Sequence, residues 1–504
     1  MTLARTLAWL FADTAAAWPV ADGSLPVTDL ALSDRDVHAG ALFLACAGSA
    51  HHGLEFAACA VAAGAAAVAW EPAPGVDAPR LDVPSLAVPH LHLLVGELAA
   101  RFFDHPSKAL GVIGITGTDG KTSTAHLLAQ ALESLHRPCL YIGTLGSGRV
   151  DALRAGLNTT PDALSIQREL AGAVAAGWHD CAMEVSSIAL DQGRVNGVQF
   201  AATVLTNIGR DHLDYHHSVA NYIAAKRKLF GRGDGAVAVL NVDDAQGRAF
   251  AAELADACPV ATYGLDPACG SALGYRAERI VTHAQGLRFD IECVAAGQPK
   301  VVARVDSALV GRFNVYNLLA AAAVLVERGI PLERACRALS AARTVPGRAE
   351  VFHGPASPAT VVVDYAHTPQ ALRHVLAALR EHTTGKLVCV FGCGGDRDRG
   401  KRPLMGAVAA ALADRCVVTD DNPRSEPPAA VVAEICAGMP AGAAVEVCED
   451  RARAIRMAVA QARAGDVVLV AGKGHEDYQI YGTERRPFSD RALAAELVGR
   501  ELAA

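Results

Sequence analysis

Runs of consecutive apolar residues recur along the chain, and nearly every run ends in a glycine-rich or charged loop. The clearest runs are GVIGIT at 111–116, DCAMEV at 180–185, AATVL at 201–205, AVAVL at 236–240, VVVD at 361–364, LVCVF at 387–391, CVV at 416–418 and VVLVA at 467–471. Such runs, separated by helical segments, are typical of parallel strands covered on both faces. The pattern therefore predicts an α/β fold whose ligands bind beyond the carboxyl ends of the strands.

Three regions of the chain differ in their pattern of apolar and polar residues. A chain of 504 residues is also too long for a single hydrophobic core. Residues 1–106 alternate short apolar runs with alanine-rich helical stretches and end at the linker-like FFDHPSK. The strand-like runs described above then follow in two groups. We expect three domains, over residues 1–106, 107–344 and 345–504.

Composition narrows the classes of partner. The formal net charge is −7, from 46 Lys and Arg against 53 Asp and Glu, so no overall basic field attracts nucleic acid or an anionic membrane. The 13 cysteines contain no C-x-x-C pair, which suits reduced thiols in a cytoplasm. The longest apolar run, at 58–70, is too short to span a bilayer. Asp13 interrupts the apolar N-terminal segment, which we interpret as an opening helix.

The stretch TGTDGKTST at 116–124 stands between a predicted strand and a predicted helix. A phosphate-binding loop needs glycines, converging backbone N–H groups, a lysine for the phosphate charge and a hydroxyl for magnesium. Gly117, Gly120, Lys121 and Thr122 supply these groups. The common consensus G-x-x-x-x-G-K-[ST] wants its first glycine at Ile115, so an ordinary glycine turn is the alternative.

A carboxylate and an imidazole follow two other predicted strands. Glu184 ends one strand, and His212 and Asp214 come after the next. With Thr122 they could complete a magnesium shell, although histidine is a less usual ligand for this ion. The alternative is a zinc site formed by His212, Asp214, His216 and His217, but consecutive histidines cannot easily share one tetrahedral ion.

The loop spacing has the form T-G-T-[ND]-G-K-[TS], so the chain resembles the Mur ligases and their folylpolyglutamate synthetase relatives. GRFNVYNLLAA at 311–321, TVPGRAE at 344–350 and VVVDYAHTP at 361–369 match further family segments in order. The resemblance implies an α/β protein of three domains: an N-terminal UDP-sugar-binding domain, a P-loop-type central ATP-binding domain with a parallel sheet, and a Rossmann-like C-terminal domain that binds the amino acid.

The resemblance also implies ATP and Mg²⁺ as cofactors. The implied ATP contacts are Gly117, Thr118, Asp119, Gly120, Lys121, Thr122, Ser123, Asn314, Asn317, Arg348 and Asp364. The implied catalytic residues are Lys121, Glu184, His212 and Lys226, and the implied magnesium ligands are Thr122, Glu184, His212 and Lys226 as a carbamate. Asp119 stands where the family more often has Asn.

Within the family, the chain resembles members that add diaminopimelate to UDP-N-acetylmuramoyl-L-alanyl-D-glutamate. NTTPDAL at 158–164 and EVSSIALDQGR at 184–194 match the segments that hold this nucleotide. The implied contacts are Leu32, Asp34, Ser49, Ala50, His51, Asn158, Thr159, Thr160, Ser186, Gln192 and Arg194. Two of the matched positions depart from the common residue: Ile188 replaces a frequent His, and Asp34 a frequent Ser.

The stretch TDDNPRSEPP at 419–428 bears on which amino acid is added. Diaminopimelate differs from lysine by a second carboxylate, and Arg424 offers a planar fork that can bind it bidentately. By the same resemblance, the diaminopimelate contacts are Arg397, Asp421, Asn422, Pro423, Arg424, Gly472 and Glu476. An ordinary Asn-Pro turn is the alternative interpretation.

The resemblance therefore implies an ATP-dependent amide-forming ligase of peptidoglycan precursor synthesis, cytoplasmic and monomeric. It would bind small-molecule substrates, with no nucleic acid or membrane partner. The open alternatives are a lysine-adding ligase, a ligase that adds glutamate to folate, and a phosphate-loop regulatory ATPase or a binding protein without ligase activity.

Overall fold

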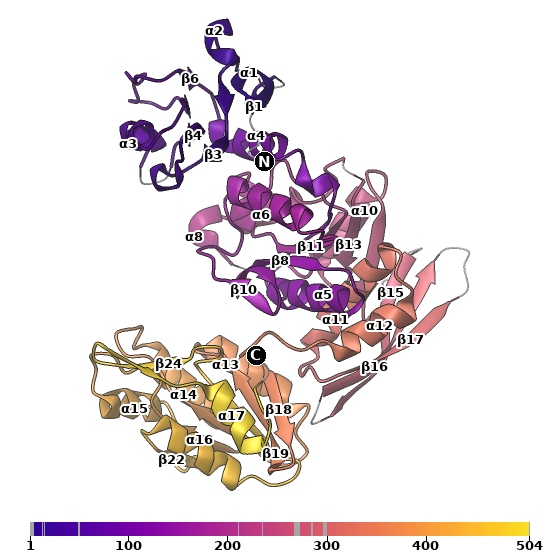
Figure 1. Cartoon of the computed structure of the whole chain (residues 1–504). Coiled ribbons are helices and arrows are strands. Elements are labelled where there is room, and N and C mark those ends of the chain that lie inside the picture. The colour runs from indigo at the N-terminus through magenta and orange to yellow at the C-terminus, as the bar shows by residue number, and fades with distance from the viewer. Residues whose placement is uncertain are drawn as a thin grey trace. The chain divides into compact units, whose positions relative to one another are not determined.

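Figure 1 shows the computed structural model, which describes residues 5–12, 14, 16–48, 51–209, 211–233, 235–266, 273–283, 286–295 and 300–502. The chain divides into two units, each with its own internal contacts. One comprises residues 1–125 and 132–262, and the other comprises 126–131 and 263–504. Among the helices in the described ranges, none combines the length and the apolar character needed to cross a membrane.

The N-terminal part of the first unit contains a small parallel sheet with strand order β3-β4-β5-β6. Its elements are β1 (Arg5–Thr6), α1 (Leu7–Leu10), α2 (Val20–Gly23), β2 (Pro26–Val27), β3 (Asp29–Ala31), β4 (Ala41–Ala45), α3 (Ala57–Ala62), β5 (Ala67–Trp70), β6 (Ser85–Ala87) and α4 (Leu91–Phe102). Both faces of β4 are buried: Leu42 and Leu44 join one apolar cluster, and Phe43 and Ala45 join another. Of the expected opening helix, the described residues contain the single turn α1, after the short strand β1.

The central sheet runs in the order β10-β9-β8-β11-β7-β12-β13-β14. Its strands are β7 (Gly111–Thr116), β8 (Cys139–Gly143), β9 (Gly146–Arg149), β10 (Ala152–Arg154), β11 (Asp180–Glu184), β12 (Ala202–Leu205), β13 (Val237–Asn241) and β14 (Val260–Gly264). Strands β8, β11, β7, β12 and β13 are parallel, as predicted. Its helices are α5 (Lys121–Ser134), α6 (Ala163–Ala175), α7 (Ser187–Asp191), α8 (Leu213–His216), α9 (Val219–Arg227) and α10 (Ala245–Leu254).

The second unit opens with an antiparallel meander that the sequence pattern did not predict. The strands are β15 (Leu273–His283), β16 (Gly286–Ala295) and β17 (Val301–Ser307), paired in sequence order. The expectation of a parallel sheet in the central domain therefore does not hold for this segment. Two helices follow it, α11 (Phe313–Glu327) and α12 (Leu332–Ala341).

The C-terminal sheet has strand order β18-β19-β23-β20-β21-β22. Its strands are β18 (Glu350–Gly354), β19 (Ser357–Asp364), β20 (Leu387–Phe391), β21 (Arg415–Val418), β22 (Val445–Val447) and β23 (Val467–Ala471), and all except the antiparallel β18 run parallel. The hairpin β24 (Tyr478–Tyr481) and β25 (Glu484–Pro487) follows.

Helices cover both faces of this C-terminal sheet (Figure 1). Residues of α13 (Pro369–Arg380), α14 (Lys401–Leu412) and α15 (Pro428–Cys436) share one apolar cluster with Val362 and Leu469. Residues of α16 (Arg451–Ala460) and α17 (Asp490–Val498) share the other cluster with Val361 and Val468. Because successive strand residues point to opposite faces, apolar runs such as VVVD supply both cores. The predicted α/β class is confirmed.

Candidate active site

The loop 117–120 joins the buried strand β7 to α5. Gly117 has a φ of +152°, and a Cβ there would lie 1.8 Å from Thr206 Oγ1, so a side chain has no room. The segment after β12 holds the loop, because Asn207 Oδ1 accepts a hydrogen bond of 3.0 Å from Asp119 N, and Thr206 Oγ1 donates one of 2.6 Å to Asp119 O. The loop is therefore supported by its neighbouring strand.

Two lysines donate hydrogen bonds to this loop. Lys121 Nζ donates to Gly117 O at 2.9 Å and to Thr118 O at 2.8 Å, and burial lowers the pKa of Lys121. Lys226, buried on α9, donates from Nζ to the same Gly117 O at 2.7 Å. Burial, and then the charge of Lys121, lower the pKa of Lys226 to about 7. Lys226 is thus partly a neutral amine near pH 7.

Glu184 is a fully buried carboxylate at the end of β11. Its Oε1 accepts hydrogen bonds from Tyr141 OH at 2.6 Å and from Thr144 N at 2.8 Å. Its Oε2 accepts one of 2.7 Å from Thr122 Oγ1, in the first turn of α5. Thr122 and Glu184 therefore meet as predicted, and their hard oxygen atoms suit Mg²⁺.

The described side-chain contact of His212 is with Asp211, not with Thr122 or Glu184. His212 precedes α8 with a φ of +49°, and its Nε2 lies 3.4 Å from Asp211 Oδ2. The Asp214 side chain lies outside the described part of the structure. His216 is buried, and its ring Nε2 forms a hydrogen bond of 3.0 Å with Ser187 Oγ, which does not favour the zinc alternative. No group of three or more His, Cys, Asp or Glu in the described ranges is arranged to hold a metal ion.

The residues expected to hold the nucleotide dipeptide gather around Glu184. Thr160 Oγ1 donates to Glu184 O at 2.9 Å and accepts from Ser186 N at 3.1 Å. Arg194 donates to Thr160 O at 2.8 Å and, through two nitrogens, to Gln192 Oε1 at 2.9 and 2.7 Å. A further hydrogen bond of 3.1 Å links Thr159 Oγ1 to Thr144 Oγ1. Asn158 is exposed beside them.

The N-terminal contacts are less fully described. Leu32 and Asp34 are half-buried just after β3, and Asp34 starts a 3-10 turn that is capped by Ser33. The exposed His51 Nδ1 lies 3.2 Å from Glu55 Oε2. Ser49 and Ala50 lie outside the described residues. The uridine contacts stay predictions.

The remaining ATP residues belong to the second unit, except Ser123, which lies in the first turn of α5. Asn314 and Asn317 are buried on α11 and bonded to each other, Asn317 Nδ2 to Asn314 Oδ1, at 2.9 Å. The Arg348 guanidinium lies 4.8 Å from the centre of the Tyr365 ring. Asp364 accepts from Ala349 N and Ala366 N at 2.7 Å each, while burial raises its pKa. Their roles toward ATP stay predictions.

The proposed amino-acid residues follow three adjacent parallel strands, β21, β20 and β23. Arg424 has a φ of +53°, accepts Gly482 N on its own carbonyl, and donates from Nη1 to Gly395 O at 2.8 Å. Asn422 Nδ2 donates to Glu476 Oε2 at 3.0 Å. A Cβ on Gly472 would lie 2.5 Å from Asp421 Oδ2. Pro423 is buried between Asn422 and Arg424, whereas Arg397 is exposed.

Several residues that contact the predicted site residues were not identified from the sequence. Tyr141, Thr144, Asn207 and Tyr222 act on residues that are distant in sequence; Tyr222 OH, for example, lies 2.9 Å from Thr118 Oγ1. No sequence spacing signals such contacts. Lys473 lies in sequence between the expected contacts Gly472 and Glu476, but only its complete burial distinguishes it from a solvated loop lysine.

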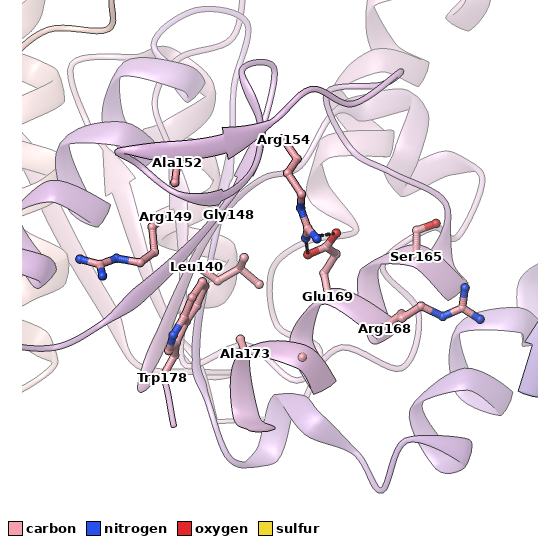
Figure 2. A pocket seen from close by; sticks show the side chains of 11 residues that line it. Leu140, Gly148, Arg149, Ala152, Arg154, Ser165, Arg168, Glu169, Ala173 and Trp178 are labelled. Atoms are coloured by element: carbon pink, nitrogen blue, oxygen red, sulfur yellow. Dashed lines mark hydrogen bonds and ion pairs between the residues drawn. The ribbon is translucent and has the colours of Figure 1, made fainter. Parts of the chain in front are cut away.

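A cavity of about 540 Å³ lies elsewhere in the first unit, between α6 and the β9–β10 hairpin (Figure 2). Leu140, Ala173 and Trp178 give it an apolar floor. Its three arginines are already paired: Arg149 with Glu133 at 3.0 Å, Arg154 with Glu169 at 2.7 Å and Arg168 with Asp29 at 2.8 Å. None of the predicted site residues lines this cavity.

Comparisons with known proteins show which proteins the chain is similar to. Curated relatives named UDP-N-acetylmuramoyl-L-alanyl-D-glutamate--2,6-diaminopimelate ligase include one from Alkalilimnicola ehrlichii and one from Pseudomonas aeruginosa. The first is 49% identical over 94% of this chain and 95% of its own, and the second is 45% identical over 95% and 97%. A solved structure with the same name covers 98% of this chain and 99% of its own, at 33% identity and a TM-score of 0.78.

A solved structure of the D-alanyl-D-alanyl-adding ligase from Acinetobacter baumannii shares the fold. It covers 94% of this chain and 96% of its own, at 20% identity and a TM-score of 0.60. Three family models match in order: Mur ligase family, catalytic domain, over 30–103; Mur ligase middle domain over 115–325; and Mur ligase, glutamate ligase domain, over 347–474. The chain belongs to the Mur ligase family.

Proposed function

We propose that the chain is an ATP-dependent ligase that joins an amine of meso-2,6-diaminopimelate to the D-glutamyl side-chain carboxylate of UDP-N-acetylmuramoyl-L-alanyl-D-glutamate. The observation that carries the proposal is Arg424, whose guanidinium donates from Nη1 to Gly395 O at 2.8 Å, in a chain whose relatives are named for this reaction. The product would be a cytoplasmic precursor of peptidoglycan, and the enzyme would act as a monomer on small molecules. A planar guanidinium suits the second carboxylate of diaminopimelate, which lysine lacks.

The phosphate loop would bind ATP. Lys121, now bonded to two neutral carbonyls, would exchange them for phosphate oxygens and offset charge as the γ-phosphoryl group moves to the D-glutamyl carboxylate. The resulting acyl phosphate is needed because a carboxylate is a poor acyl donor. Attack by the amine would then release phosphate through a tetrahedral intermediate.

Thr122 and Glu184 would hold Mg²⁺, which when bound offsets negative charge on phosphate oxygens. We include His212 and Lys226 in this set as proposals. Lys226 is buried with a pKa of about 7, so a neutral amine is available to add carbon dioxide and form a carbamate. Carbamylation would convert a cation into an oxygen ligand.

Mass spectrometry of the reaction product tests the proposal. We incubate the purified protein with ATP, Mg²⁺, the UDP-muramoyl dipeptide and either diaminopimelate or lysine. We expect the nucleotide to gain the mass of one diaminopimelate residue only when ATP is present. An unmodified nucleotide, or one that gains lysine in preference, would overturn the proposal.

A further inference from the structure

The loop after β23 contains a fully buried lysine to which the proposed reaction gives no role. Lys473 has 0% exposure, and its Nζ lies 2.9 Å from Glu476 Oε2 and 3.1 Å from Asn422 Oδ1. Removing an ammonium from water is unfavourable unless it is paired and hydrogen-bonded. A buried lysine at this position is therefore held by its partners and in turn holds them.

The partners of Lys473 are residues proposed to contact the amino acid. Asn422 Oδ1 also accepts from Ile480 N at 3.0 Å, and Asn422 Nδ2 donates to the same Glu476 Oε2 at 3.0 Å. Lys473, Asn422 and Glu476 thus form a closed triangle of hydrogen bonds. The ammonium also lies 3.9 Å from Asp421 Oδ1, so it has two carboxylates within 4 Å.

A second buried cation, Arg451, forms its hydrogen bonds with other groups. Arg451 donates to both carboxylate oxygens of Asp490 at 2.8 Å, and to the carbonyls of Asp420 and Ala471 at 3.1 and 2.9 Å. These bonds direct its guanidinium to α17 and the backbone. The cation that hydrogen-bonds directly to Glu476 here is therefore Lys473.

We propose that Lys473 is a positioning residue for the amino-acid substrate. Its ammonium fixes the Glu476 carboxylate and the Asn422 amide in one orientation and offsets the repulsion between Asp421 and Glu476. A substrate ammonium would then meet a preformed acceptor set rather than a mobile one. The inference rests on the diaminopimelate site proposed above.

Steady-state kinetics of Lys473→Met test this role. We expect the KM for diaminopimelate to rise roughly tenfold or more, because Glu476 loses a charge-assisted bond, while the KM values for ATP and the UDP-muramoyl dipeptide stay within about twofold. In a Glu476→Gln background the same substitution should raise that KM less than about threefold, since the two residues act together. The exposed Lys386, which precedes β20 at the opposite strand end, supplies the control Lys386→Met.

Each outcome of these measurements either supports or overturns the positioning role of Lys473. An unchanged KM for diaminopimelate, a loss of kcat alone, or equal increases in all three KM values would overturn the positioning role. Lys473→Gln, which keeps a hydrogen-bond donor, should show the same selective KM increase if Lys473→Met yields too little folded protein by circular dichroism. If the wild-type protein shows no diaminopimelate-dependent phosphate release, the proposed function itself fails, and this inference fails with it.

Discussion

Lys121 donates hydrogen bonds to two neutral carbonyl groups of its own loop, Gly117 O and Thr118 O. Hydrogen bonds from an ammonium to anionic oxygens are stronger than those to neutral carbonyls. A bound phosphate would therefore draw Lys121 away from the loop. The residue is thus poised to exchange partners rather than to stabilise the fold.

Lys121→Ala should lower ATP-dependent phosphate release by roughly a hundredfold or more, because the transition state loses a preorganised cation. The unfolding temperature should change little, since only loop carbonyls lose a partner. Coupled-enzyme phosphate detection and thermal melts measure the two effects. Lys228→Ala, which removes an exposed pair with Asp191 at 2.7 Å, serves as the control. Turnover of Lys121→Ala within about threefold of the wild type would sink the assignment.

The site was predictable from the sequence where residues directly follow strands. Glu184 ends β11 and Thr122 lies in the first turn of α5 after β7, and adjacent parallel strands bring such ends together. The burial of Lys473 could not be predicted, because a lysine in a glycine-rich loop is normally solvated. His212 comes seven residues after the end of β12, and that longer loop leaves its side chain beside Asp211.

At the scale of elements, continuous apolar runs located the buried parallel strands correctly. The meander β15–β17 was missed because its pattern differs. In β17, residues 301–307, buried and exposed positions alternate from Val302 onwards, as expected for an antiparallel strand with one solvated face. A search for continuous runs passes over such alternation.

Helices α14 and α15 are joined by one buried guanidinium. Arg402 on α14 donates to Glu426 Oε1 and Oε2 at 2.7 and 2.8 Å, and to Glu434 on α15 at 2.8 Å. The hydrogen bonds from Arg402 lower the pKa of Glu426 from 4.5 to about 2. A lowered carboxyl pKa adds stability that is fully present above pH 4.5 and is lost as the pH falls toward 2.

The variant Glu426→Gln tests this pH dependence. At pH 7 its urea-unfolding midpoint should lie below that of the wild type, because the buried Arg402 loses an ionic partner. The difference should shrink as the pH falls from 4.5 toward 2, where the wild-type carboxyl also becomes neutral. Circular dichroism at pH 7, 4 and 3 follows the midpoints. A difference that stays constant over this range would contradict the assignment.

At the scale of the whole molecule, the three family matches lie within the three predicted domains, over residues 30–103, 115–325 and 347–474. The relatives at 45–49% identity also align over nearly their full length. Three segments of the chain thus match Mur ligase family models in order. We therefore expect the chain to carry out the proposed ligation reaction rather than ATP hydrolysis alone.

The proposed ligation is tested by steady-state phosphate release. The release is measured with diaminopimelate, with lysine or with no amino acid. ATP, Mg²⁺ and the UDP-muramoyl dipeptide are present throughout, and Arg424→Ala is measured beside the wild type. We predict that diaminopimelate raises wild-type release roughly a hundredfold over the other two conditions, and that Arg424→Ala loses most of this preference. If the wild type releases as much phosphate with lysine as with diaminopimelate, or the same amount without any amino acid, the proposed ligation is contradicted.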